Sequence, residues 1–481
     1  MTGICGPFWR NMSIINFTIY RAILRLADVH GANRGGKMSR IFEDRAYEAA
    51  SLVGCFWAAD YPRRDLAWPQ ARQDISTDVA IIGAGYTGLS AALHLAEQGI
   101  DVSVFDMHQP GWGASGRSGG FCCQGGALAG EASIRSRFGQ SVLEDWDEAQ
   151  IKAVGLVAEL IAKHGISADT HSRGETQLAH SAKAYRRMQR QAENDRQTGK
   201  TVEFIETQEL AAHGMRNASL LGGRTDPVGF ALHPRKYVLG LAEAAAGQGA
   251  RIYSRAPVLG IQRASGGYEL TLQSAKVRAK KLIVATNGYS RDDIPKWLKG
   301  RFLPVQSNII VTRELTNAEL QSQGWTSSQM VYDTRNLLHY FRLLPDNRMM
   351  FGMRGGISAT PRMDRQMHRM IRRDFNAMFP AWRHVETPWF WTGLVCLTRK
   401  RVPFIGAIPA MPDAFAGFGW HGNGIAMGTY AGKLLAALAS GQECTIPSVL
   451  RGVPSRLPFG NRRRAILPPI YKGLALRDRL S

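Results

Sequence analysis

Three glycines and an acidic residue form the pattern in this chain that is best suited to bind a phosphorylated ligand. Gly83, Gly85 and Gly88 fit G-x-G-x-x-G, and Asp106 follows them by about 20 residues. Glycines at this spacing allow a tight turn, a close approach of the backbone to a pyrophosphate, and close packing of a helix on a strand. Free amide hydrogens at the helix start attract phosphate, and an acid accepts hydrogen bonds from a ribose diol. The pattern predicts a dinucleotide site, with a purely structural turn as the alternative.

The elements around these residues must hold them at the end of a buried strand. Residues 79–82 form a short apolar run that suits a parallel strand, and "LSAALHLAEQG" continues as a helix that stops at Gly99. Tyr86 and Thr87 precede this run and are assigned to the same site. A second apolar run, "DVSVFD", ends at Asp106. Strand, helix, strand and terminal acid together are much more specific than the glycines alone.

A glycine-rich stretch, "GWGASGRSGGFCCQGG" at residues 111–126, follows this unit. It has three interpretations: a slack linker, a redox or metal site, or a loop shaped around a ligand. A nicotinamide enzyme would usually continue into another helix and strand, whereas extended glycine backbone can wrap a pyrophosphate and reach the ring of a larger cofactor. We therefore predict FAD and no metal, with contacts from Ala114, Ser115, Arg117 and Gly120. The adjacent cysteines are interpreted as reduced packing residues.

Composition restricts the remaining classes of function. A chain of 481 residues exceeds what one core usually holds, so two domains are expected. The net charge of +21 comes from basic residues that are scattered, without the aromatic interleaving or helix signature of a nucleic-acid binder. Solvated helix faces explain it better, although contact with an anionic membrane surface stays open. Six scattered cysteines favour a reducing compartment, and we expect a cytoplasmic protein.

The first 40 residues have no recognised counterpart. Their apolar stretch, "MSIINFTIYRAILRLADV", is broken by Arg21 and Arg25, so it does not reach the roughly 18 to 20 apolar residues that span a bilayer. We expect a disordered extension or a misassigned start, with translation beginning at Met38. An amphipathic helix on a membrane and a targeting segment are the alternatives.

Seven stretches of the chain, in order from about residue 75 to 440, carry a resemblance to a known family. They are "DVAIIGAGYTGLSAALHLAEQG", "GWGASGRSGG", "HPRKYVLGLAEAAAGQGARIY", "KLIVATNGY", "HYFRLLPDNRMMFGMRGG", "VPFIGAIP" and "GFGWHGNGIAMGTYAGKLLA". The chain resembles the FAD-dependent amino acid and amine oxidoreductases of the D-amino acid oxidase and glycine oxidase superfamily, and most of all their γ-glutamylputrescine oxidase branch.

The resemblance implies an α/β fold in which a Rossmann-type FAD-binding domain carries an inserted α+β substrate domain built on an antiparallel sheet. We expect the FAD-binding domain at residues 41–170, 226–300 and 390–445, and the substrate domain at 171–225 and 301–389. The basic tail, 446–481, should pack on the flavin domain or trail free. Cys396 stands out of register with the cysteine that binds flavin covalently in some relatives, so the flavin is expected to be non-covalent.

Further cofactor contacts are implied by the resemblance. Val258 would present its backbone to the adenine, and a strand end would border the cofactor through Ala285, Thr286 and Gly288. A glycine turn before a long helix would lie at the flavin ring, where the positive helix end stabilises the negative charge of reduced flavin. Its residues are Gly419, Gly422, Asn423, Gly424 and Ile425. Asn423 stands where relatives often have His, so it can donate a hydrogen bond but not a proton.

Two strands around a "PDN" turn, in "NLLHYFRLLPDNRMMFGMRGG", would belong to the substrate sheet. Tyr340 and Arg342 match its "YFR" signature, and plain packing is the alternative for Tyr340. Arg354 and Arg335 are candidate anchors for a substrate carboxylate. Other candidates are Trp391 and Trp420 as walls, and Tyr340, His339 and His421 as proton acceptors.

The expected reaction oxidises the C–N bond of an amine or amino acid, such as a γ-glutamylputrescine-like substrate, to an imine. Hydride passes to flavin N5, and O2 reoxidises the flavin. One alternative is a D-amino acid or glycine-type dehydrogenase that passes electrons to a quinone or another acceptor. A flavin-binding protein without turnover is the alternative from outside the enzyme class.

Overall fold

Strand β1 (Ile75–Ile82) lies inside an eight-stranded sheet, which we call the first sheet. The computed structural model describes residues 40–63 and 65–480, so the expectation for the N-terminal extension lies outside the described residues. The main path of the first sheet runs through β17 (Phe404–Ala407), β18 (Ala414–Phe418), β11 (Lys276–Val284), β1, β2 (Val102–Phe105) and β8 (Arg251–Tyr253). The β18-β11-β1-β2-β8 pairs are parallel, as the apolar runs predicted for β1 and β2.

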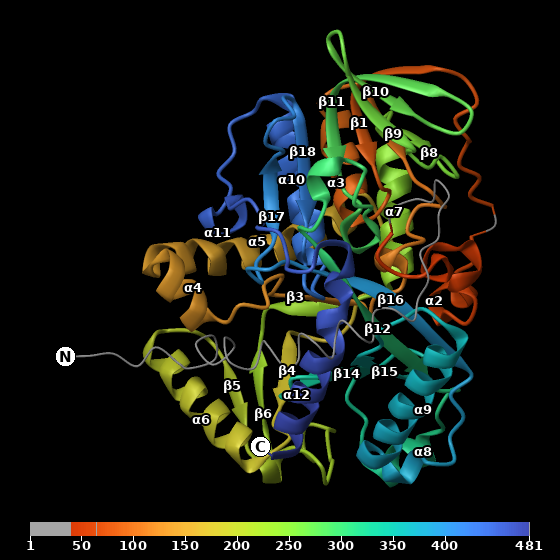
Figure 1. The fold of residues 1–481 in the computed structure, drawn as a ribbon. Coiled ribbons are helices and arrows are strands. Elements are labelled where there is room, and N and C mark those ends of the chain that lie inside the picture. The colour runs from red at the N-terminus through yellow and green to blue at the C-terminus, as the bar shows by residue number, and fades with distance from the viewer. Residues whose placement is uncertain (1–39, 64, 481) are drawn as a thin grey trace. The chain divides into compact units, whose positions relative to one another are not determined.

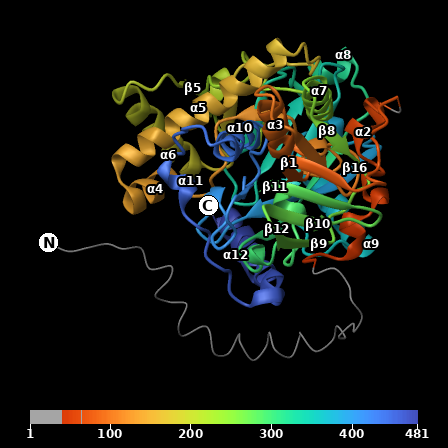
Figure 2. The same cartoon turned by 90° about the horizontal axis from the view of Figure 1, so that it is seen from above.

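Side chains that alternate along β1 separate the two faces of the first sheet. Val79 and Ile81 pack with helices α3 (Tyr86–Ala96), α7 (Pro234–Gly247) and α10 (Ala426–Ser440). Ala80 and Ile82 pack on the other side, with β10 (Gly267–Thr271), which pairs with β9 (Gly260–Ala264) and β11. Figure 2 shows α3, α7 and α10 on one side of β1 and β11, and β9 and β10 on the other.

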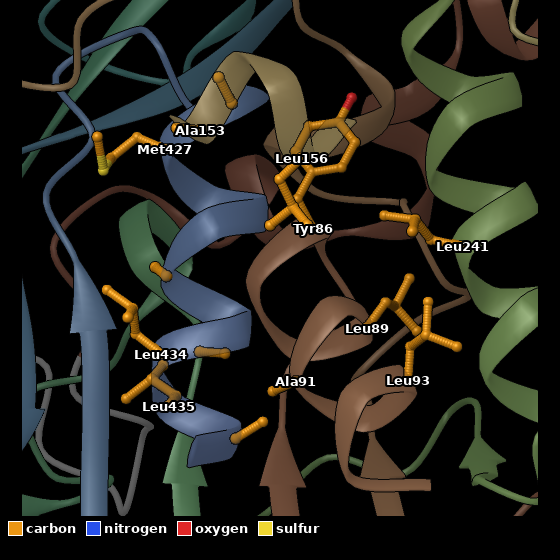
Figure 3. Packing of buried hydrophobic residues seen from close by; sticks show 14 of the residues in the cluster. Tyr86, Leu89, Ala91, Leu93, Ala153, Leu156, Leu241, Met427, Leu434 and Leu435 are labelled. Carbon is orange, nitrogen blue, oxygen red and sulfur yellow. The ribbon is translucent and has the colours of Figure 1, made fainter. Parts of the chain in front are cut away.

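Helix α3 is buried on nearly all sides because two other helices flank it. In Figure 3 it runs between α10 and α7, with Leu89 and Leu93 directed toward α7 and Ala91 toward α10. Small residues allow the close approach of α10, since a Cβ added to Gly432 would lie 2.5 Å from Ser90 Cβ. This packing holds the N-terminus of α3 rigidly at the end of β1.

A second eight-stranded sheet lies below the first in Figure 1. Its order is β16 (Trp389–Leu397), β12 (Leu303–Val311), β15 (Met349–Arg354), β14 (His339–Leu343), β13 (Met330–Asp333), β4 (Glu175–Leu178), β6 (Gly223–Asp226) and β5 (Glu203–Ile205). Every neighbouring pair is antiparallel except β13 with β4. The predicted hairpin around "PDN" is therefore confirmed as β14 and β15.

Shorter elements complete the described part of the chain, and η denotes a 3-10 helix. Before the second sheet is complete they are η1 (Asp44–Tyr47), η2 (Ala49–Leu52), α2 (Phe56–Asp60), η3 (Ala114–Gly116), the paired strands β3 (Phe121–Cys123) and β7 (Gly229–Ala231), α4 (Glu131–Phe138), α5 (Gln140–Lys163), α6 (Ala182–Gln197) and η4 (Thr207–Glu209). The later ones are η5 (Asn287–Tyr289), η6 (Lys296–Leu298), α8 (Asn317–Gln323), α9 (Pro361–Met378), η7 (Pro380–Trp382), α11 (Ser448–Arg451), η8 (Gly460–Ile466) and α12 (Leu467–Leu480). Within residues 40–63 and 65–480, no helix combines the length and apolarity that crossing a bilayer requires.

Two segments lie elsewhere than the sequence-based domain limits place them. Strand β16 pairs along its whole length with β12, so residues 390–397 belong to the second sheet and not to the FAD-binding domain. Phe56 and Trp57 also pack against residues of the second sheet, including Ile309 and Trp391. Local sequence does not reveal either placement, because both depend on strands far away in the chain.

The C-terminal segment packs back on the protein and contacts regions next to both sheets. Arg463 is fully buried and forms a two-pronged ion pair with Asp292, at 2.7 and 2.9 Å. At the far end of α12, the Asp478 carboxylate accepts hydrogen bonds from the backbone N–H groups of Asn336 and Leu337, in the turn between β13 and β14. Helix α12 is thereby anchored at both ends.

The buried Arg463–Asp292 pair provides a test of this anchoring. We expect Asp292→Asn to lower the free energy of unfolding by about 3–5 kcal/mol, because it leaves a buried guanidinium without its carboxylate. Urea denaturation followed by circular dichroism measures the loss. Glu148→Gln, which breaks the exposed ion pair with Lys152, is the control and should leave the midpoint unchanged. Equal midpoints for both variants would contradict the anchoring role.

Candidate functional site

The turn between β1 and α3 has the geometry that its glycines predict. Gly83 adopts a φ of +105°, and a Cβ on Gly88 would lie 1.9 Å from the Gly83 carbonyl oxygen. A Cβ on Gly85, the residue that caps α3, would lie 2.9 Å from Ser115 Oγ. The turn therefore has no room for larger residues, and its exposed backbone can approach a ligand closely.

Asp106 closes the other side of this turn, as expected for the terminal acid. Its carboxylate accepts hydrogen bonds from the N–H groups of Ala84, at 2.7 Å, and His108, at 2.8 Å. Burial raises the pKa of Asp106, and these backbone hydrogen bonds act in the opposite direction. Each carboxylate oxygen has a second lone pair, so Asp106 can still accept from a ribose hydroxyl.

The glycine-rich loop, residues 111–126, is fastened to α3 by Ser115. Its hydroxyl accepts from the Tyr86 N–H at 3.1 Å, and the Tyr86 hydroxyl donates to the Ser115 carbonyl at 2.6 Å. Ala114 and Ser115 form η3, which leads into the loop. Thr87 is buried in the same helix, with its Oγ1 facing Gly428 of α10. The sequence analysis correctly brings these residues together, whereas their contact with FAD stays a prediction.

Arg117 has a different environment from the one expected. Its guanidinium donates to the carbonyl oxygens of Trp112, Ser51 and Thr392 and to the Ser51 hydroxyl, and it lies 4.4 Å from the centre of the Trp112 ring. Most of its donors are therefore used to hold the loop in place. The charge that we expected near the phosphates has its hydrogen bonds within the protein.

Unpaired polar atoms around the loop fit a ligand such as FAD. Gln109 Oε1, Trp112 Nε1 and Ser118 Oγ are buried and have no hydrogen-bond partner. Buried polar atoms are almost always paired, so these three favour a bound group that offers both donors and acceptors. The tight glycine turn and the free lone pairs of Asp106 agree with this. The residues present fit FAD.

The turn before α10 lies against the loop, as the resemblance implies. Asn423 donates through Nδ2 to the Gln124 carbonyl at 2.9 Å and to Cys123 Sγ at 3.7 Å. Gly419 and Gly422 have φ values of +90° and +118°, and Gly424 and Ile425 lead into the helix. This arrangement directs the positive end of α10 toward the loop.

The remaining cofactor candidates lie around the end of β11. The Ala285 N–H donates to the Ile82 carbonyl at 2.9 Å, and the Thr286 hydroxyl bonds that of Ser290 at 2.7 Å. A Cβ on Gly288 would lie 2.7 Å from the Leu394 carbonyl oxygen, and one on Gly120 would lie 2.1 Å from that of Leu232. Val258 is buried in the core between β2 and β10.

Cys396, the cysteine considered for covalent flavin attachment, is buried in the same core. Burial raises the pKa of its thiol to about 12, so it stays protonated and unreactive at neutral pH. Cys122 and Cys123 are also free and buried. These observations favour a non-covalent cofactor, which stays a prediction.

Tyr340 faces the glycine-rich loop from β14. Its ring lies where Cβ atoms on Gly119 and Gly352 would otherwise be, at 2.9 and 2.1 Å. Its hydroxyl bonds Ser307 Oγ at 2.9 Å, and burial raises its pKa to about 12. Tyr340 is therefore placed to contact a substrate, but at neutral pH it holds its proton and does not act as an acceptor.

Two other substrate candidates are structural in this arrangement. The buried guanidinium of Arg342 donates to the carbonyl oxygens of Gly119 and Leu232 and to His171 Nε2. The buried Trp391 indole donates to the Arg117 carbonyl at 2.9 Å and packs near Trp57. Both side chains position the loop, and their polar atoms are already occupied. The predicted substrate contacts of these two residues are therefore not supported.

The histidine candidates are also engaged within the protein. His421 donates through Nδ1 to the Gly126 carbonyl and accepts at Nε2 from the Thr398 N–H, while burial lowers its pKa to about 4. No ring nitrogen remains for a substrate proton. His339 and Arg335 both pair with Asp333, so Arg335 is not available as a carboxylate anchor.

Arg354 is the candidate anchor whose charge is not balanced. Its guanidinium donates one hydrogen bond, to the His421 carbonyl at 3.3 Å, and it has no carboxylate partner among the described residues. Burial lowers its pKa, whereas the nearby Tyr340 and Tyr471 act in the opposite direction. Tyr471 belongs to α12, and the sequence analysis did not include it in the site.

Glu175, at the start of β4, is a second residue that the sequence analysis missed. Burial raises the pKa of its carboxyl to about 7, and Asp226 on the neighbouring strand adds to this, while the Cys123 thiol acts in the opposite direction. No local signal distinguishes this residue in "RGETQLAH". Its position beside Cys123 arises only when β4 and β3 come together.

A parallel sheet with a glycine turn, a terminal acid and a wrapped glycine loop defines a dinucleotide-binding protein of the flavoprotein class. The chain belongs to the DAO family of FAD-dependent oxidoreductases, since the model of that family, described as FAD dependent oxidoreductase, matches residues 78–438. It is an enzyme that uses FAD, as predicted.

Individual relatives agree with the family. A probable oxidoreductase OrdL of Haemophilus influenzae is 30% identical over 412 residues, which cover 84% of this chain and 92% of the relative. A γ-glutamylputrescine oxidoreductase of Escherichia coli is 29% identical over 85% of this chain and 94% of the relative. The crystal structure of a glycine oxidase from Geobacillus kaustophilus superposes with a TM-score of 0.65 at 21% identity, over 77% of this chain and 96% of that one. It shows the same fold.

The tight contact at Gly88 predicts a specific loss of cofactor. In Gly88→Ala the new Cβ must displace the Gly83 carbonyl, so we expect less than about a tenth of the wild-type FAD to remain after gel filtration. Visible absorbance relative to protein measures this ratio. Gly155→Ala, at an open position on α5, is the control and should keep FAD while stabilising the helix by about 1 kcal/mol. Full FAD content in Gly88→Ala would contradict the assignment of the turn.

The raised pKa of Glu175 predicts a pH-dependent effect on stability. The folded protein holds this proton up to about pH 7, whereas the unfolded chain loses it near pH 4.5, so ionisation destabilises the fold as the pH rises between these values. Glu175→Gln should therefore increase the free energy of unfolding by about 1–3 kcal/mol at about pH 8, and by much less at about pH 5. Urea titrations at both pH values test this. An equal effect at both would show that the carboxyl does not titrate as described.

Proposed function

We propose that this protein oxidises the C–N bond of a small amine or amino acid that carries a carboxylate, with a γ-glutamylputrescine-like compound as the substrate. The buried Arg354 guanidinium is the observation on which the proposal rests, because a buried charge without a partner is costly. A substrate carboxylate would balance it through two parallel hydrogen bonds. The name of the Escherichia coli relative supports this class of substrate.

The protein's own residues supply position and electrostatics. Arg354 would hold the carboxylate, and Tyr340 would limit the space above Gly119. When FAD is bound, it supplies a ring that accepts hydride from the carbon next to the amine nitrogen. The amine must lose its proton first, and a site with little water lowers the pKa of the amine.

The acceptor of electrons in this proposal is O2. A dehydrogenase that reduces a quinone or another acceptor is the second candidate, and the net charge of +21 favours it, since basic proteins bind to anionic membranes. Oxygen uptake and dye reduction, measured with the same substrate, separate the two. Amine oxidation with neither readout would leave a different acceptor.

The first experiment records the visible spectrum during anaerobic addition of γ-glutamylputrescine. Flavin bands that bleach support the proposal, and bands that persist with this and other carboxylate-bearing amines contradict it. We further expect Arg354→Gln to raise KM about 100-fold, which is about 3 kcal/mol of lost binding. Arg369→Gln, on the exposed side of α9, is the matched control and should leave KM unchanged. An unchanged KM in Arg354→Gln would remove this residue from the site.

A further inference from the structure

Glu175 lies on the face of the second sheet that looks toward the glycine-rich loop. Tyr332 is paired with Tyr340 on one side and with Gln177 on the other, and Glu175 is two residues before Gln177. Residues directly opposite or two apart in neighbouring strands share a face. The side chain of Glu175 therefore points to the same side as that of Tyr340, which contacts Gly119 of the loop.

A single side chain separates Glu175 from the turn before α10. Its carboxyl is hydrogen-bonded to the Cys123 thiol, and Cys123 Sγ also accepts from Asn423 Nδ2 at 3.7 Å. Asn423 belongs to the turn that the family resemblance places at the flavin ring. Glu175 is thus next to the proposed reaction site although it is distant from it in sequence.

The polar groups around Glu175 contain negative charge without a matching cation. Asp226 is directly opposite on β6 and accepts from the Val228 N–H at 3.0 Å and from Gln124 Nε2 at 3.4 Å. The guanidinium of Arg224 on the same strand pairs with Asp195 instead, at 2.6 Å. In the described part of the chain, no lysine or arginine forms an ion pair with Glu175 or Asp226. Like charges placed opposite each other in a sheet are destabilising unless something compensates them.

Tyr332 supplies an independent indication of a ligand at this place. Its pKa is raised by burial and then by Glu175 and Cys123, and its hydroxyl has no hydrogen-bond partner among the described residues. An enclosed hydroxyl without a partner is rare in native proteins and points to a group that binds there. The side chain of Glu175 retains some accessible surface, so a ligand can reach it.

We propose that Glu175 binds the amino group of the substrate and accepts a proton from it. This inference rests on the proposed function and names the group that the earlier candidates, Tyr340 and His421, do not supply. An alkylammonium ion is the cation that the uncompensated carboxyl attracts, and the Tyr332 hydroxyl is positioned to bind the same nitrogen. In the step itself, the N–H bond breaks and an O–H bond forms on Glu175, so the ammonium becomes a neutral amine and no electron is transferred. The neutral amine is the form from which hydride can leave.

The groups around Glu175 make this step sensitive to pH near neutrality. Its pKa of about 7 reflects burial first, with Asp226 raising it and the Cys123 thiol lowering it, while Arg224 acts on the neighbouring Tyr332. Only the ionised carboxylate can accept a proton, so flavin reduction should accelerate as the pH rises through about 7. A substrate ammonium that loses its hydration in the site has a lowered pKa, which allows the transfer.

The test compares Glu175→Gln with Glu203→Gln, a matched change at an exposed position on β5 of the same sheet. Anaerobic stopped-flow measures the rate of flavin reduction by γ-glutamylputrescine between about pH 6 and pH 10. We expect Glu175→Gln to slow the reaction about 100-fold at pH 7, to lose the rise through pH 7, and to recover toward high pH, where the amine is neutral in solution. Glu203→Gln should keep the wild-type profile.

A binding measurement separates this inference from the proposed function. Butylammonium and acetate are titrated into each holoenzyme by calorimetry, without turnover. Glu175→Gln should weaken butylammonium at least about tenfold and leave acetate unchanged, since Arg354 is intact. If no amine reduces the wild-type flavin, the proposed function fails, and the butylammonium titration alone decides the role of Glu175. Wild-type affinity for butylammonium in Glu175→Gln, together with an unchanged pH profile, would overturn the inference.

Discussion

Two buried arginines tie the glycine-rich loop to both halves of the protein, and the geometry of the site depends on them. Arg342 on β14 donates to the carbonyl oxygens of Gly119 and Leu232, and Arg117 of the loop donates to the carbonyls of Thr392 on β16 and Ser51. Hydrogen bonds from charged donors to carbonyls are stronger than neutral ones and hold their geometry in a buried setting. Without them, flexible glycine backbone would have no fixed position between the sheets.

The positive charge of the chain is organised differently inside and outside. Most of the basic residues lie on the surface, whereas the buried guanidinium groups are used for carbonyl oxygens, as in Arg342, or for one acid, as in Arg463. Arg354 is the exception close to the loop, and Glu175 is the acid without a cation on the same sheet. The two unbalanced charges give the site one positive and one negative region. A substrate with a carboxylate and an amino group would complement both.

Sequence reasoning worked best where the chemistry is local. The turn with Gly83, Gly85 and Gly88, the helix after it and the position of Asp106 follow from spacing alone, because neighbouring residues form them. It was weakest for polar side chains whose partners are distant. His421 and Trp391 looked like reactive or wall residues, yet their partners are carbonyl groups of residues 126 and 117. Glu175 gave no signal, since its neighbours come from β3, β6 and β13.

The sequence by itself determined the class of protein: a dinucleotide fold with a flavin loop, a second domain on a mostly antiparallel sheet, and membership of an FAD-dependent family. It could do so because short-range spacing and apolar alternation encode these features directly. Only the tertiary structure decided which charged residues are free to meet a ligand. Packing β16 against β12 and α12 across the β13–β14 turn satisfies some polar groups and isolates others, and this depends on contacts between segments up to hundreds of residues apart.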